Sequence, residues 1–223
     1  MRDYRKLTKK QLDVLTSVGT FGYLTTREIA QLCWPQAAPK AALKAAQEVV
    51  TDLRTDRLLL TRQLRVNGLT HAYVLTSRSA ELLNDAHLQI AFSAGYNLAT
   101  DRQVMRQPVL DLAHAWAKAK GLGAVGPRGL AADAWGLGAF AGLDVLLVDP
   151  DNMTPAFGVM LVRGFDVQTV ERLKRDCKLS VPILLAGRDY DQRRIEALVK
   201  VRAWAAPFNE EVLQLNKPEG LLC

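Results

Sequence analysis

The chain has 223 residues, of which 49% are hydrophobic and 23% charged, a composition typical of a folded globular protein of one or two domains. No apolar run approaches the roughly 20 residues that a membrane-spanning helix requires, and no apolar segment follows the basic N-terminus as it would in a secretory signal. Three scattered cysteines without a CxxC pair argue against a disulfide framework and a cysteine-based zinc site. We therefore expect a cytoplasmic protein without a metal or another cofactor.

The positive charge is concentrated in the first third of the chain. Of the net charge of +6, residues 1–80 contribute 13 Lys and Arg against 6 Asp and Glu, a balance of +7. Residues 81–223 contain 16 Lys and Arg against 17 Asp and Glu, a balance of −1. A basic N-terminal module beside a nearly neutral one favours a polyanionic partner, with nucleic acid as the first candidate. A solvated basic surface without any partner is the alternative.

Three helices are predicted at the start of the chain. Thr8 is a suitable N-cap for a helix over residues 9–18, and Gly19 is expected to end it. A threonine cap with an acidic residue at the capping-box distance predicts a second, two-turn helix that ends before Trp34 and Pro35. Pro39 is expected to open a third helix that runs to about residue 55.

The third helix combines an apolar and a polar face. Its apolar stripe consists of Ala42, Ala46, Val49 and Leu53, and the alanines allow close packing on neighbouring helices. The polar face carries Lys40, Lys44, Gln47, Thr51 and Arg54. Such long polar side chains are suited to the major groove of duplex DNA, which is wide enough to admit a helix. A helix face that is simply solvated would show the same spacing.

A β-hairpin is predicted directly after this helix. Residues 58–65 and 69–75 have the composition of strands, and Asn67-Gly68 between them is a strong type I′ turn signal. Three helices followed by a hairpin with a basic tip form the winged helix-turn-helix order. In that arrangement the third helix reads the major groove and the wing contacts phosphates or the minor groove. A further helix is predicted from residue 77 to about residue 88.

The predicted DNA-contacting residues come from three elements. The start of the second helix would meet phosphates, the third helix would enter the groove, and the hairpin would supply the wing. In that order the residues are Thr25, Thr26 and Arg27; Lys40, Lys44, Gln47, Thr51 and Arg54; and Arg62, Arg65, Asn67 and His71.

The N-terminal third also resembles a known family. The segments LTKKQLDVLTSVGTFGYLTTREIAQLCWP, AALKAAQEVVTDLRTDRLLL and HAYVLTSRSAELL are similar to the replication-relaxation family of plasmids and integrative elements. The similarity covers about residues 7–85, and other winged-helix regulators share parts of the pattern. It implies DNA binding in the replication, mobilisation or transcriptional control of a mobile element.

The remainder of the chain is predicted to form an α/β unit with a mostly parallel sheet, because apolar strands alternate with helices. Strands are expected at 143–149, 157–162, 181–186 and 201–205, and helices at 109–120, 166–178 and 191–200. Residues 121–126 satisfy a GxGxxG pattern, but no strand precedes it, and we predict a loop. The expected division is a winged-helix domain at 1–88, a linker with some helical content at 89–107, the α/β domain at 108–208 and a tail at 209–223.

The resemblance further implies a domain similar to the restriction-endonuclease fold in this position. An active nuclease of that kind needs an acidic residue before a strand and an acid-x-Lys pattern on the next, with a divalent ion held by the carboxylates. Asp133 is available as the first acid, and Asp144 or Asp149 as the second, but the lysine is missing after both. We therefore predict a catalytically inactive domain, and Asp149 is expected to form a turn with Pro150.

Together these patterns predict a homodimeric, sequence-specific double-stranded DNA-binding protein of overall α/β class that is not an enzyme. Transcriptional regulation within a plasmid or integrative element is the favoured role. A relaxosome or replication-origin accessory protein is the alternative. A metal-dependent nuclease built on Asp133 and Asp149 is the third hypothesis.

Overall fold

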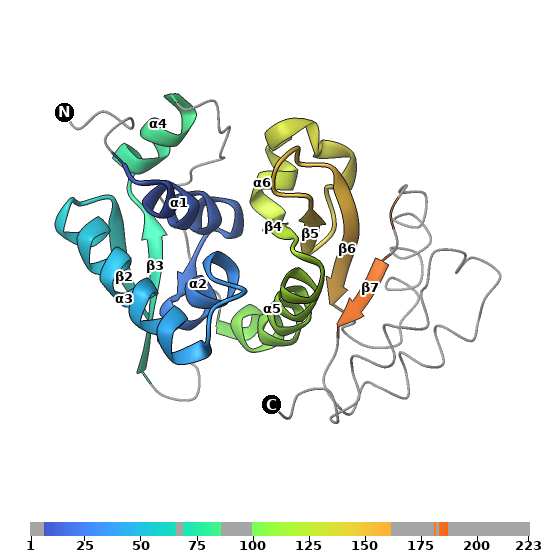
Figure 1. Cartoon of the computed structure of the whole chain (residues 1–223). Coiled ribbons are helices and arrows are strands. Elements are labelled where there is room, and N and C mark those ends of the chain that lie inside the picture. The colour runs from blue at the N-terminus through green and yellow to red at the C-terminus, as the bar shows by residue number, and fades with distance from the viewer. Residues whose placement is uncertain (1–6, 66–68, 86–99, 162–180, 182, 187–223) are drawn as a thin grey trace.

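The computed structural model describes residues 7–65, 69–85, 100–161, 181 and 183–186. Figure 1 shows two parts side by side, with the N-terminal helices and a small sheet on one side and a second sheet with a long helix on the other. The class is α/β overall, as the sequence predicts, and the described strands form one three-stranded and one four-stranded sheet. No helix in the described ranges is long and apolar enough to cross a membrane.

The N-terminal part contains the helices and the hairpin at the predicted positions. The elements are α1 (Lys9–Phe21), β1 (Leu24–Thr25), α2 (Thr26–Cys33), α3 (Pro39–Thr55), β2 (Leu59–Arg65), β3 (Leu69–Leu75) and α4 (Ser77–Asp85). The strand order is β1-β3-β2, and both pairings are antiparallel. The Asn67-Gly68 turn and the predicted end of the last helix at residues 86–88 lie outside the described residues.

Reciprocal caps fix the starts of the first two helices. The Thr8 hydroxyl accepts from the Gln11 amide at 3.2 Å, and the Gln11 side-chain oxygen accepts from the Thr8 amide at 3.0 Å. Thr25 and Glu28 repeat this arrangement at α2. The predicted end of α1 at Gly19 is wrong, because burial of Val18 and Phe21 keeps the last turn helical. Gly22 ends the helix instead, with a φ of 85° that glycine adopts without steric cost.

The second part begins with a long helix and continues into the four-stranded sheet. Its elements are α5 (Thr100–Lys120), β4 (Gly123–Val125), α6 (Pro127–Ala131), the short 3-10 helices η2 (Ala134–Gly136) and η3 (Gly138–Phe140), β5 (Val145–Val148), β6 (Pro155–Leu161) and β7 (Ile183–Ala186). Helix α5 already occupies residues 100–107 of the predicted linker. The predicted helices at 166–178 and 191–200, the strand at 201–205 and the tail at 209–223 lie outside the described residues.

Two predictions for this sheet are wrong. The described strands have the order β4-β5-β6-β7, and only the β6–β7 pairing is parallel, so the sheet is not mostly parallel. The turn from Asp149 to Thr154 joins β5 to β6 directly, whereas a parallel crossover needs a dozen or more residues. The predicted loop at 121–126 contains β4, which pairs with β5 through Gly123 and Val125.

The two parts share a hydrophobic core. One cluster of buried side chains runs from Leu15 and Ile29 in the N-terminal helices through Trp116 in α5 to Leu147 and Val159 in the second sheet. Helix α5 lies against β5 and β6 and also contacts α2. A second cluster lies between α6, η3 and the sheet. The α/β unit is therefore packed directly on α1 and α2.

Candidate nucleic-acid interface

Helix α3 packs on α1, α2 and β2 through one face and leaves the opposite face exposed. The buried face consists of Ala42, Ala46, Val50 and Leu53. The predicted stripe contained Val49 in place of Val50, and Val49 is only half-buried. All five predicted groove residues are exposed, namely Lys40, Lys44, Gln47, Thr51 and Arg54.

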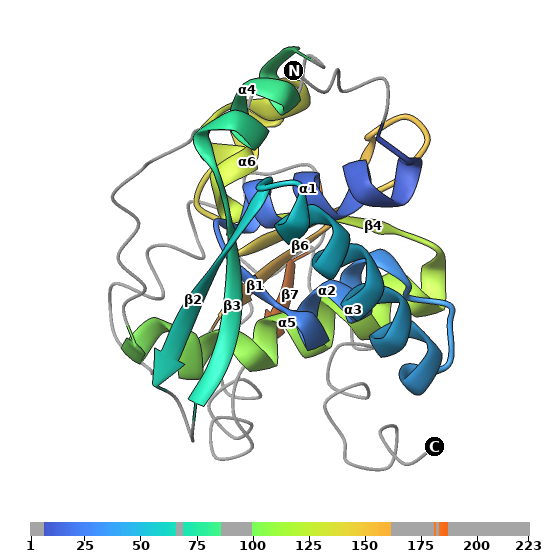
Figure 2. The ribbon, with the colours of Figure 1, turned by 90° about the vertical axis from the view of Figure 1, so that its left-hand side faces the viewer.

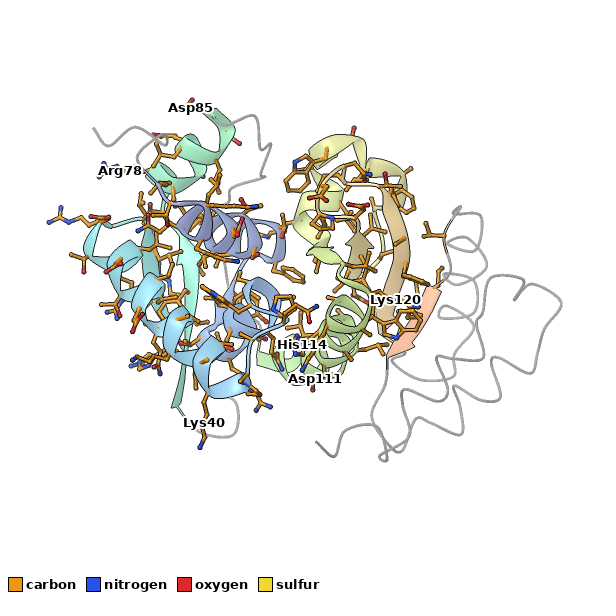
Figure 3. All side chains as sticks on the ribbon, viewed as in Figure 1. Lys40, Arg78, Asp85, Asp111, His114 and Lys120 are labelled. Atoms are coloured by element: carbon orange, nitrogen blue, oxygen red, sulfur yellow. The ribbon has the colours of Figure 1, made fainter. Side chains whose placement is uncertain are left out.

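The exposed face of α3 and the hairpin lie on the same side of the molecule. Figure 2 looks onto that side, with α3 and the β2–β3 hairpin in front and the second sheet behind them. In Figure 3 Lys40 extends away from the protein at the end of the molecule where β2 ends and β3 begins. The described residues of the second part therefore leave this surface uncovered.

The hairpin contributes further polar side chains to this end. Arg62 pairs with Ala72 and Gln63 with His71 across the two strands. Arg62, Gln63 and His71 are all exposed. Arg65 is the last residue of β2, opposite Leu69. Asn67 lies outside the described residues.

The predicted phosphate-contacting residues at the start of α2 have different surroundings. The Thr25 hydroxyl accepts from the Glu28 amide at 3.3 Å and so caps α2. The Thr26 hydroxyl donates to the Tyr73 hydroxyl at 3.4 Å, which ties α2 to β3. Both threonines are half-buried, whereas Arg27 is exposed. Arg27 is therefore the most accessible of the three for a phosphate.

Helix α3 exposes further residues that the sequence analysis did not single out, among them Leu43, Glu48 and Asp52. Leu43 keeps 37% of its surface exposed on the polar side of the helix, where it can meet the methyl group of thymine. Glu48 and Asp52 are also exposed, and Glu48 lies 4.0 Å from the Lys44 ammonium group. At ~100° per residue, the two acids lie on one flank and Leu43, Gln47 and Arg54 on the other. Both acids were visible in the sequence, but the polar face was predicted from its basic, amide and hydroxyl side chains alone.

Two of the three acidic residues considered for a nuclease, Asp133 and Asp149, have roles in turns. The Asp149 carboxylate accepts from the Asp151 amide at 2.9 Å and from the Asn152 side chain at 3.4 Å, as its predicted turn requires. Asp133 is exposed, has a φ of 54° and accepts from the Gly138 amide. Among the residues that the structure describes, no three His, Cys, Asp or Glu side chains are grouped so as to hold a metal ion.

Two titratable side chains lie at packed positions behind this surface. Burial raises the pKa of the Cys33 thiol to about 11, which outweighs the opposing hydrogen bond with Ser17. Burial also lowers the pKa of His114. The thiol therefore stays protonated at neutral pH, which argues for a packing role at the end of α2.

Comparisons with known proteins were made at the level of sequence family, curated protein and solved structure. No protein-family model, curated protein or solved structure matches the chain. The function is therefore inferred from the residues of the chain and their geometry.

Proposed function

We propose that this protein binds double-stranded DNA, with the exposed face of α3 in the major groove and the hairpin against the adjacent backbone. The supporting observation is that five polar side chains of α3 are exposed. Helix α3 and the hairpin also share one side of the molecule that the other described residues leave open. The balance of +7 in residues 1–80 supplies the attraction to phosphates. In this proposal the N-terminal part is a winged helix-turn-helix.

Each element has a distinct task in this proposal. Gln47 and Leu43 have the chemistry to read an adenine–thymine pair, since an amide bonds adenine and an alkyl group contacts the thymine methyl. Lys40, Lys44 and Arg54 would neutralise phosphates or contact guanine. Arg62 and His71 would contact the backbone or the minor groove beside the hairpin.

Two-fold pairing would extend the site to a palindromic operator. A homodimer would place two α3 helices on half-sites ~34 Å apart, one turn of the duplex. A dimer on a palindromic operator, together with the resemblance to replication-relaxation proteins, favours transcriptional regulation within a mobile element. A replication-origin or relaxosome accessory role is the alternative. Footprinting separates the two, because the regulator protects its own promoter and the accessory protein protects an origin.

Salt-dependent binding of a duplex tests the proposed surface. Lys40→Gln and Arg54→Gln each remove one positive charge from the α3 face. Each is expected to weaken binding and to reduce the slope of log affinity against log salt by about one for each phosphate that the variant no longer neutralises. Arg78→Gln is the matched control, because Arg78 is exposed on α4 at the opposite end from Lys40. Equal effects of the three variants would refute the assignment of α3.

A further inference from the structure

A cleft opens where the N-terminal helices meet the second sheet. Its volume is about 530 Å³, and α1 and β4 form its two long sides. The segment after α2 and the β5–β6 turn also line it. This volume is within the range of about 300–1,000 Å³ that is typical of small-molecule sites, which often lie between domains.

The cleft is closed at one end by tight packing. Gly126 lies so close to the end of α1 that an added Cβ would be 2.5 Å from the Thr20 main-chain oxygen. Thr20 and Val125 beside this contact line the cleft and are buried. Lys9, Pro150 and Gly121 line it as exposed residues. The cleft therefore has a closed inner end and an open rim.

The floor and the rim differ in chemistry. Val125, Val148 and Cys33 form a buried, mostly apolar floor, and Leu122 and Met153 add half-buried apolar surface. An apolar molecular body would be desolvated on this floor. The charged residues of the lining, Lys9, Lys10, Asp13 and Asp151, are half-buried or exposed.

The charges of the rim are distributed unevenly. Lys10 lies 3.5 Å from the Asp13 carboxylate and donates to the Cys33 main-chain oxygen at 3.0 Å, so the Lys10 and Asp13 charges offset each other. Lys9 is the first residue of α1, and the first turn of that helix carries no acidic residue. The helix dipole adds to the positive potential there. Among the described residues Lys9 forms no ion pair, so an anionic group is favoured beside it.

We infer that this cleft binds a small organic molecule with an apolar body and one anionic group, which lies near Lys9. Pro35 and Gln36 also line the cleft, and they lead from α2 into α3. The cleft therefore adjoins the segment that leads into α3. The inference concerns the cleft alone and does not depend on DNA binding.

Two fluorescent probes that differ only in charge test the site. Anilinonaphthalene sulfonate and N-phenylnaphthylamine share the same aromatic body, and only the first carries a sulfonate. We expect one sulfonate probe per chain, bound about five- to tenfold more tightly than the neutral probe, since a lysine and a helix end each contribute modestly. Lys9→Gln should remove most of this difference and leave the neutral probe unaffected.

A cleft-filling substitution locates the bound probe. Thr16 is half-buried in the lining, and Thr16→Trp should weaken the binding of both probes at least about tenfold. Thr55→Trp is the matched control, since Thr55 is exposed on α3 and does not line the cleft. Circular dichroism verifies that both variants fold, and the exposed Lys9→Gln variant tests the site without demanding any repacking. The inference is wrong if both probes bind equally, or if folded Thr16→Trp binds them like the control.

Discussion

His114 donates a hydrogen bond of 2.9 Å from Nδ1 to the main-chain oxygen of Gln31, and this bond joins α5 to α2. A second bond across the same junction runs from the Gln36 side chain to the Lys118 main-chain oxygen at 2.8 Å. Figure 3 shows His114 on the side of α5 that faces the N-terminal helices. Both bonds hold the end of α2 and the start of the α2–α3 segment against the second part of the chain.

The burial of His114 predicts a pH-dependent stability. Burial lowers the pKa of His114, and the Lys118 charge acts in the same direction, against the Gln31 hydrogen bond and the Asp111 charge. Between the folded pKa and the unfolded value of about 6.5, the unfolded chain binds more protons than the folded one. The free energy of unfolding should therefore fall as the pH is lowered below about 6.5, and level off below the folded pKa. Urea unfolding of wild type and His114→Gln at several pH values measures this slope. An unchanged slope in the variant would contradict the assignment to His114.

The junction between the two parts leaves no space for a side chain at Gly126. A Cβ at this position would lie 2.5 Å from the Thr20 main-chain oxygen and 2.7 Å from the Phe21 amide nitrogen. Gly126→Ala should therefore lower the free energy of unfolding by about 1–3 kcal/mol or more, because main-chain atoms must move. Gly123→Ala is the matched control, since its Cβ would meet its nearest neighbour, Val148, at an ordinary 3.7 Å. A comparable midpoint shift for both variants in urea would show that the junction is not tightly packed.

The local signals of the sequence predicted the N-terminal part well. The caps at Thr8 and Thr25, the proline that starts α3 and the alternating hairpin act over a few residues, and the structure contains each of them. Gly19 misled the prediction of α1, because its effect on the helix is outweighed by burial of the residues around it. The role of Thr26 could not be predicted either, since its partner Tyr73 lies far away in the sequence.

Strand pairing in the second part depends on similarly distant contacts. Apolar runs identify β5 and β7 as buried strands but do not fix their neighbours. Strand β6 runs antiparallel to β5 because the turn at Asp149 joins the two directly. Gly123 belongs to a strand only because it pairs with Val148. The candidate groove residues of α3 were predictable because they follow the helical repeat. The cleft was not, since α1 and β4 meet only in the folded chain.

Two substitutions of the core residue Trp116 should differ widely in how much they lower the free energy of unfolding. Its ring is 1% exposed, lies 4.6 Å from the Phe157 ring and is covered by the Lys120 ammonium group at 4.9 Å. Trp116→Ala should cost about 3–5 kcal/mol through the cavity that it leaves. Within the described part of the chain the indole nitrogen has no hydrogen-bond partner, so Trp116→Phe loses no such bond. We expect Phe to cost less than half as much as Ala in chemical unfolding. Equal costs would show that a phenyl ring does not fill the site and would contradict the cavity argument.

The acidic flank of α3 predicts variants that bind DNA more tightly. Glu48 and Asp52 are exposed beside the proposed groove residues, and the Glu48 carboxylate lies 4.0 Å from the Lys44 ammonium group. Near a duplex both carboxylates repel phosphates, and Glu48 also competes for Lys44. Glu48→Gln and Asp52→Asn should each raise the affinity for a duplex of mixed sequence about two- to fivefold at low salt, with a smaller gain at high salt.

The control for this prediction is Glu81→Gln, which removes one negative charge from the exposed side of α4. All three variants change the net charge by the same amount, so a gain confined to α3 reflects the position of the charge relative to the duplex. Fluorescence anisotropy over a series of salt concentrations measures the effect. A gain that is equal in all three would indicate only a general charge effect. A loss of affinity in Glu48→Gln would instead indicate that this carboxylate accepts a hydrogen bond from a cytosine amino group in the groove.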